Sequence, residues 1–249
     1  MADKNSTALH QEGLSYFRES RTFALSIVSI LPLVVLYHWG IIQSGYSERN
    51  MAEVWLVGPL HLVGLGAAHV LNVVLVIAFI AVLWRSERSA SFSLLAAVGI
   101  AGEAAFYAAL LFKGAPALAG LLDERASHVI FAVNLRPHAP FLLALGAGVY
   151  EELFFRLLLL GGGTWLLSRL FMWNRPVSML VALVVSSLLF AGAHHIGPLA
   201  DPLESYSLVF RTVCGMLLGV VFLTRGLGVA VWTHAIYNAL VILQQAGGP

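Results

Sequence analysis

Long apolar runs alternate with short polar segments along almost the whole chain. Seven of these runs approach the roughly 20 residues that an α-helix needs to cross a bilayer, and they cover residues 23–42, 62–84, 92–112, 139–160, 177–196, 206–223 and 227–245. Residues 174–176 and 201–202 carry turn signals with proline, and residues 116–137 have the mixed polarity of an interfacial helix and loop. The pattern therefore predicts an all-α, polytopic transmembrane helix bundle with about seven spans.

The composition agrees with a membrane protein rather than with a soluble domain. Hydrophobic residues make up 59% of the 249 positions and charged residues only 11%, and the mean hydropathy is +0.85. The net charge is +1 and no block of basic residues occurs, so we expect a lipid bilayer and no nucleic acid as partner. The polar residues 1–22 do not end in a small-residue cleavage site, which predicts a cytoplasmic or interfacial segment before a retained first helix.

Glu151, Glu152 and Arg156 stand out in the fourth run, because an ionised side chain at membrane depth costs at least a few kcal/mol. Glu152 and Arg156 are four residues apart with the acid first, the spacing at which two side chains meet on one helix face. Glu151 lies about 100° round an α-helix from Glu152 and cannot share that partner in the same way. The spacing predicts a structural Glu152–Arg156 pair and a chemically available Glu151. The alternative is that all three charges only join neighbouring helices.

Polar side chains recur in two later runs. His194 follows Phe190 by four residues at the end of the fifth run, and His234 and Asn238 share one helix face in the seventh. A carboxylate, two imidazoles and an amide can together split an amide bond with water. Glu151 can take a proton, and His194 can help to activate water or protonate the leaving amine. His234 and Asn238 can donate hydrogen bonds to the developing oxyanion.

The three motifs, taken in this order, resemble those of a known family. EExxxR at 151–156, FxxxH at 190–194 and HxxxN at 234–238 are similar to the motifs of the CAAX protease and bacteriocin-processing (CPBP) family of intramembrane endopeptidases. The resemblance covers about residues 139–245. His195 would fit the second motif after a shift of one residue, but the spacing from Phe190 favours His194.

The resemblance implies a glutamate-dependent intramembrane endopeptidase without a cofactor. The residues that it assigns are Glu151, His194, His234 and Asn238 in catalysis, with Glu152 and Arg156 as supports. Residues 139–249 are then expected to form the catalytic core, and residues 23–138 the N-terminal transmembrane helices and interfacial loop. We expect a multi-pass protein of the prokaryotic plasma (inner) membrane that cleaves a membrane-anchored or exported protein or peptide near the membrane surface. Prenylated proteins, bacteriocin or pheromone precursors and C-terminal sorting anchors all remain open as substrates.

Three other functions use the same residues. Glu151, His194 and His234 could bind zinc and leave one position open, although no HExxH motif is present and three separate spans would have to supply the ligands. A non-catalytic scaffold or immunity-type protein would keep the polar cluster for assembly. A proton-coupled transporter predicts paired inverted halves, and none is visible.

Two further charges lie alone in apolar runs. Glu103 is in the third run and Arg211 in the sixth, and we expect them to pair with each other or with the site. His69 and Asn72, three residues apart in the second run, favour hydrogen bonds between helices rather than catalysis.

Overall fold

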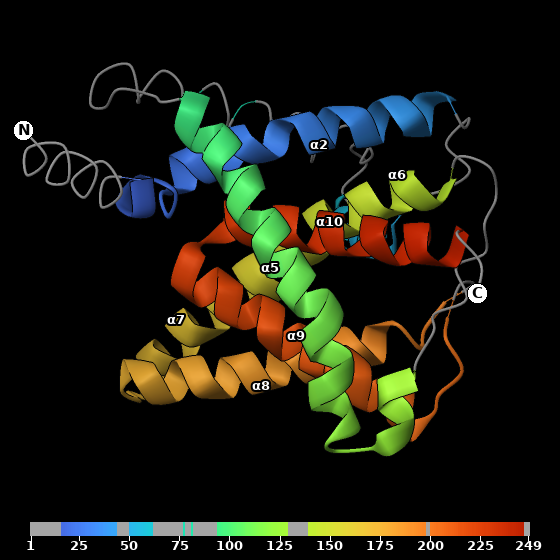
Figure 1. Cartoon of the computed structure of the whole chain (residues 1–249). Helices are drawn as coiled ribbons and strands as arrows, with labels where there is room; N and C mark the ends of the chain where they lie inside the picture. Colours follow the sequence, from blue (N-terminus) through green and yellow to red (C-terminus); the bar gives the residue numbers. More distant parts are fainter. Residues whose placement is uncertain are drawn as a thin grey trace, which may run out of the picture.

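The computed structural model describes residues 16–43, 50–61, 77, 81, 94–128, 139–197 and 200–246. Helices account for nearly all of these residues and no strand occurs among them, which confirms the all-α prediction. The helices are α2 (Phe23–Gln43), α3 (Met51–His61), α5 (Leu94–Gly120), the 3-10 helix η1 (Glu124–His128), α6 (Ala139–Gly146), the π-helix η2 (Ala147–Gly162), α7 (Gly163–Leu170), α8 (Arg175–Ala193), α9 (Ser205–Arg225) and α10 (Leu227–Ala246) (Figure 1).

Within the described residues, the five helices α2, α5, α8, α9 and α10 are long and apolar enough to cross a membrane. They correspond to five of the predicted spans, whereas the predicted span 62–84 lies outside the described residues except for positions 77 and 81. Helix α5 differs most from its prediction. It continues through Pro116 to Gly120, so the first residues of the expected interfacial segment are part of a span. Proline is tolerated inside transmembrane helices because neighbouring groups satisfy the freed carbonyl.

The run predicted as one α-helical span at 139–160 is helical but not α-helical throughout. Gly146 and Gly163, at the two ends of η2, keep right-handed helical backbone angles, so α6, η2 and α7 follow one another without a break. The α-helical geometry expected around Glu151 was therefore wrong. Hydrogen bonds from i to i+5 give a wider helix, in which neighbouring side chains are no longer about 100° apart.

Helix α10 lies at the centre of the bundle, between α2 and α9 in Figure 1, and it contacts α2, α5, α6, η2 and α9. Small residues let these helices approach closely. A Cβ atom added to Gly148 of η2 would lie 2.6 Å from the Cβ of Ala235 and 2.9 Å from its backbone nitrogen. This close approach places Glu152 beside His234, the residue that precedes Ala235.

Two tight connections set the ends of the last three helices. Asn174 caps α8, because its Oδ1 accepts a hydrogen bond from the backbone nitrogen of Val177 at 3.0 Å, and Pro176 lies in the first turn. Gly226 alone separates α9 from α10 and has φ +90°, a conformation that glycine adopts without strain. These residues fix where α8 begins and how α10 turns back along α9.

Candidate active site

Glu151 of η2 faces two imidazole rings from two other helices. Its Oε2 lies 3.9 Å from Nε2 of His194 and 3.9 Å from Nε2 of His234. Its Oε1 accepts a hydrogen bond from Nδ2 of Asn50 at 2.9 Å. Oε2 is buried and has no hydrogen-bond partner in the part of the chain that the structure describes. One carboxylate oxygen is therefore held, and the other is available between the imidazoles.

His194 is placed by the last turn of α8. Its Nδ1 lies 2.8 Å from the carbonyl oxygen of Phe190. Because a carbonyl oxygen only accepts, Nδ1 carries the proton and a neutral ring turns the lone pair of Nε2 toward Glu151. His195 faces another way, with Nδ1 at 3.1 Å from the carbonyl oxygen of Asp201. The spacing from Phe190 thus selects the histidine that lies beside Glu151.

His234 is held by a second carboxylate. Its Nδ1 lies 2.7 Å from Oε1 of Glu152, and Oε2 of Glu152 lies 3.2 Å from Nε of Arg156. The Glu152–Arg156 pair was predicted from sequence, whereas the contact between Glu152 and His234 was not. Because a carboxylate only accepts, Nδ1 of His234 donates this hydrogen bond, and the contact orients the ring with Nε2 toward Glu151.

Arg156 connects three helices at the base of the site. Nη2 donates a hydrogen bond to the carbonyl oxygen of Gly215 on α9 at 3.4 Å, and the guanidinium carbon lies 4.4 Å from the ring centre of Phe190 on α8. Both Arg156 and Glu152 are almost completely buried. A buried cation with these contacts has a structural part in the site, because it balances the charge of Glu152.

Asn238 lies one helical turn after His234 on α10 and is half-buried. Its amide makes no hydrogen bond to the residues that the structure describes. Of the four residues predicted for catalysis, Glu151, His194 and His234 are linked by the distances given above. Asn238 is connected to them through its place on α10.

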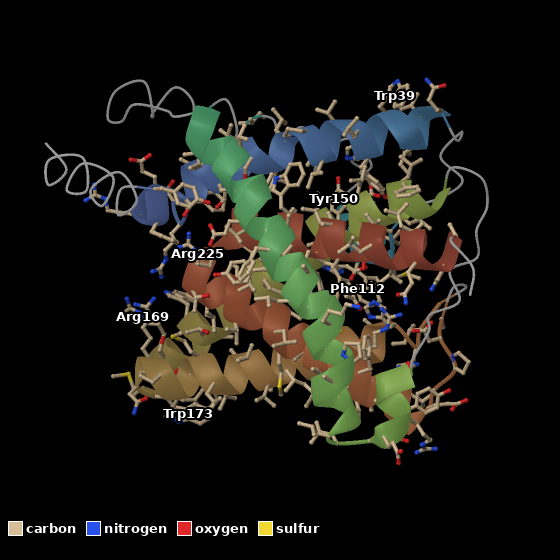
Figure 2. All side chains as sticks on the ribbon, in the orientation of Figure 1. Trp39, Phe112, Tyr150, Arg169, Trp173 and Arg225 are labelled. Carbon is tan, nitrogen blue, oxygen red and sulfur yellow. The ribbon has the colours of Figure 1, made fainter. Side chains whose placement is uncertain are left out.

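Tyr150 and Asn50 anchor the glutamates to the N-terminal helices. Tyr150 is fully buried, and its hydroxyl lies 2.5 Å from Nε2 of His38 on α2; Figure 2 shows Tyr150 between α2 and α10. Asn50 was missed by the sequence reasoning. Asn50 and Glu53 have the spacing of a helix N-cap and its N3 acid, which would have indicated where α3 begins. No local pattern could have indicated that Asn50 touches Glu151.

Arg211 and Glu103 were expected to pair with each other or with the site, and they do not pair with each other. Nη2 of Arg211 donates a hydrogen bond to Oδ2 of Asp201 at 2.7 Å, in the segment that follows His194. Glu103 instead pairs with Arg225, the last residue of α9. In the sequence, Arg225 lies in the short polar segment between two apolar runs. In the structure it is the last residue of α9, directly before the turn at Gly226, and it contacts Glu103 on α5.

The described residues include no group of three or more His, Cys, Asp or Glu side chains arranged to hold a metal ion. A family model described as type II CAAX prenyl endopeptidase Rce1-like matches residues 135–240. Residues 135–240 are therefore similar to the Rce1-like CAAX protease domain, which is consistent with the CPBP family. The matched region contains all six residues predicted for the site, from Glu151 to Asn238. No curated protein and no solved structure matches the chain.

The apolar helices and the match together support a multi-pass integral membrane protein with a CAAX-protease kind of function. The candidate residues of the matched region lie on or at the end of three helices within it: η2, α8 and α10.

Proposed function

We propose that this protein is a glutamate-dependent intramembrane endopeptidase in which Glu151 is the general base. One observation carries the proposal: Oε2 of Glu151 is buried, has no hydrogen bond from the described residues and lies 3.9 Å from two imidazole nitrogens. A buried polar atom without a partner is rare in proteins, and a catalytic role is one of the explanations for it. The CAAX protease domain supplies the reaction class.

The spacing suits one water molecule as the nucleophile. Hydrogen bonds of about 2.8 Å from one water to Oε2 of Glu151 and to Nε2 of His194 are compatible with the separation of 3.9 Å between these two atoms. Glu151 takes a proton from the water as its oxygen attacks the carbonyl carbon of the scissile peptide. When the carbon–nitrogen bond breaks, the proton passes to the leaving amine.

The two histidines have different parts because they have different neighbours. His194 is backed by a neutral carbonyl, which favours a neutral ring that accepts a hydrogen bond from the water. His234 is backed by the Glu152 carboxylate, which accepts a hydrogen bond from Nδ1 and turns Nε2 toward Glu151. Its Nε2–H then donates to the carbonyl oxygen as negative charge develops there, and the amide of Asn238 is the second donor.

The substrate in this proposal is a membrane-anchored protein or peptide that is cleaved near the membrane surface. The family description names prenylated CAAX proteins, so a farnesylated CAAX peptide is the first probe. A quenched form of this peptide, mixed into vesicles that contain the purified protein, reports turnover directly.

The test compares wild type with Glu151→Gln at matched abundance in two measurements. The first is cleavage of this peptide, and the second is a proteomic comparison of the termini of membrane proteins in cells that express each form. We expect cleavage of the peptide, and newly formed termini of cleaved membrane proteins, with wild type only. Glu103→Gln is the matched control, because it makes the same chemical change in a carboxylate outside the site and should retain both activities. Cleavage that persists in Glu151→Gln would reject Glu151 as the base. The absence of any cleaved peptide or terminus with wild type would favour a scaffold or immunity-type protein.

A further inference from the structure

Asn50 reaches the site from outside the matched region, and its polar groups are all engaged. Nδ2 donates to Oε1 of Glu151 at 2.9 Å, and Oδ1 accepts from the backbone nitrogen of Ala52 at 2.8 Å. The backbone nitrogen of Asn50 donates to the hydroxyl of Tyr37 at 3.0 Å, and its carbonyl accepts from the nitrogen of Val54 at 3.2 Å. The side chain is nearly buried, with 8% exposed. Asn50 is therefore held in one orientation.

The contacts behind Asn50 fasten the start of α3 to α2. The buried hydroxyl of Tyr37 donates to Oε2 of Glu53 at 2.6 Å while it accepts from the backbone of Asn50. In a capping box, the acid at N3 would accept from the N-cap nitrogen directly. Here the Tyr37 hydroxyl lies between the two groups, so the cap of α3 also depends on α2.

Helix α3 packs directly on the helix that carries Glu151. The ring centre of Trp55 lies 5.7 Å from that of Phe154 and 6.5 Å from that of Phe155. Asn50 thus lies between two fixed surfaces, the Tyr37–Glu53 contact on one side and η2 on the other. The Asn50 amide has a set position relative to the Glu151 carboxylate.

We propose that Asn50 is a positioning residue of the active site, which holds Oε1 of Glu151 so that Oε2 stays between His194 and His234. The terminal torsion of a glutamate is broad, so an unheld carboxylate can turn either oxygen toward the imidazoles or away from them. The hydrogen bond from Nδ2 removes this freedom. The inference rests on the proposed role of Glu151 as base, and it makes the N-terminal helices part of the site.

The experiment separates the amide of Asn50 from its capping function. Asn50→Ser keeps a good N-cap, because serine ranks with asparagine at this position, but its shorter side chain has no amide to reach Glu151. Asn50→Ala removes both functions. Asn50→Gln keeps an amide donor but is a poorer cap. The kcat, KM and unfolding midpoint of each are measured in vesicles with the quenched farnesylated CAAX peptide.

We expect Asn50→Ser to unfold at the wild-type midpoint, with KM unchanged and kcat lowered about tenfold or more, as when a catalytic group loses its orienting partner. Asn50→Gln should recover part of kcat in spite of a lower unfolding midpoint. A wild-type kcat in Asn50→Ser would overturn the proposal, and so would kcat that falls only in step with the unfolding midpoint across the three variants.

Glu151→Gln on the same peptide keeps this result distinct from the proposed function. Activity retained in Glu151→Gln would reject the role of Glu151 and with it the positioning role. Inactive Glu151→Gln together with fully active Asn50→Ser would reject the positioning role alone.

Discussion

Glu103 and Glu151 are buried to almost the same extent, with 14% and 13% of their side chains exposed, but their partners differ. Both oxygens of Glu103 are engaged. Oε1 pairs with Nε of Arg225, and Oε2 accepts from Nη2 of Arg225 at 2.9 Å and from the hydroxyl of Tyr16 at 2.7 Å. In Glu151 only Oε1 is held. The exposed fraction of the side chain does not distinguish the two carboxylates. They differ in Oε2, which accepts hydrogen bonds in Glu103 and accepts none from the described residues in Glu151.

The engaged carboxylate belongs to a cluster with a structural use. Arg225 also donates to Oγ of Ser20 at 2.9 Å, and its guanidinium lies 4.5 Å from the ring centre of Phe17. The cluster fastens residues 16–20 to α5 and to the end of α9, where Figure 2 shows Arg225. A fully paired ion cluster has no group left for chemistry. The comparison therefore supports the proposal that Glu151 is the reactive carboxylate and that Glu103 is a structural one.

The largest expected effect is on turnover in Glu151→Gln. Loss of a general base should lower kcat by about a thousandfold, within the range typical of such groups, while the free energy of unfolding stays near that of wild type. Glu103→Gln is the matched variant. It should lose about 2 kcal/mol of stability, because Arg225 keeps a charge without its partner, and the folded fraction should keep its kcat. Loss of kcat in Glu103→Gln, together with loss of stability alone in Glu151→Gln, would mean that Oε2 of Glu151 is not the reactive oxygen.

Asn238→Ala should lower kcat about a hundredfold with little change in KM, the scale expected when one oxyanion donor is removed. The matched control is Gln244→Ala, which removes an exposed amide from the same helix and should leave kcat unchanged. Steady-state kinetics with the quenched peptide measure both. An unchanged kcat in Asn238→Ala would remove Asn238 from the site.

Glu152→Gln should affect stability and turnover together. Arg156 would be left as an uncompensated buried charge, at a cost of about 3 kcal/mol. A neutral amide also holds the His234 ring in place less firmly than a carboxylate does, so we expect kcat of the folded fraction to fall about tenfold. Arg156→Ala should show a similar loss of stability. Full loss of activity in well-folded Glu152→Gln, with Glu151→Gln still active, would show that the two carboxylates have been assigned the wrong way round.

Gly148→Ala should have the smallest effect on turnover. The new methyl group would meet Ala235 on α10, which costs about 1–3 kcal/mol and shifts Glu152 away from His234, so we expect a kcat lower by a few-fold. Gly102→Ala on α5 is the matched control, because an added Cβ there meets no atom within 4 Å. Equal behaviour of the two variants would show that the η2–α10 contact does not position the site.

Much of this molecule could be predicted from local patterns. The bounds of α2, α8, α9 and α10 follow the apolar runs closely, because the length needed to cross a bilayer and the turn signals at residues 174–176 and 201–202 are both local. Glu151, His194 and His234 could be singled out because polar side chains at membrane depth are rare. The division of the chain at residue 139 stays a prediction, and the contact from Asn50 to Glu151 crosses it.

What could not be predicted depends on which helices face each other. The pairing of Glu103 with Arg225, the contact of Glu152 with His234 and the hydrogen bond from Asn50 all join residues at least 82 positions apart. Hydrophobic periodicity gives the faces of a helix but not the neighbour of each face. The π-helical form of η2 was also missed, because the predicted spacing assumed α-helical geometry throughout.

The most direct test of the glutamate mechanism measures metal content and turnover on the same purified samples. The account predicts that wild type, treated with a chelator until it holds far less than one zinc ion per chain, cleaves the quenched peptide at the untreated rate. It also predicts that His234→Ala loses activity without any change in metal content. Stoichiometric zinc in wild type that disappears in His234→Ala, together with inactivation by the chelator, would contradict the account and identify a metalloprotease.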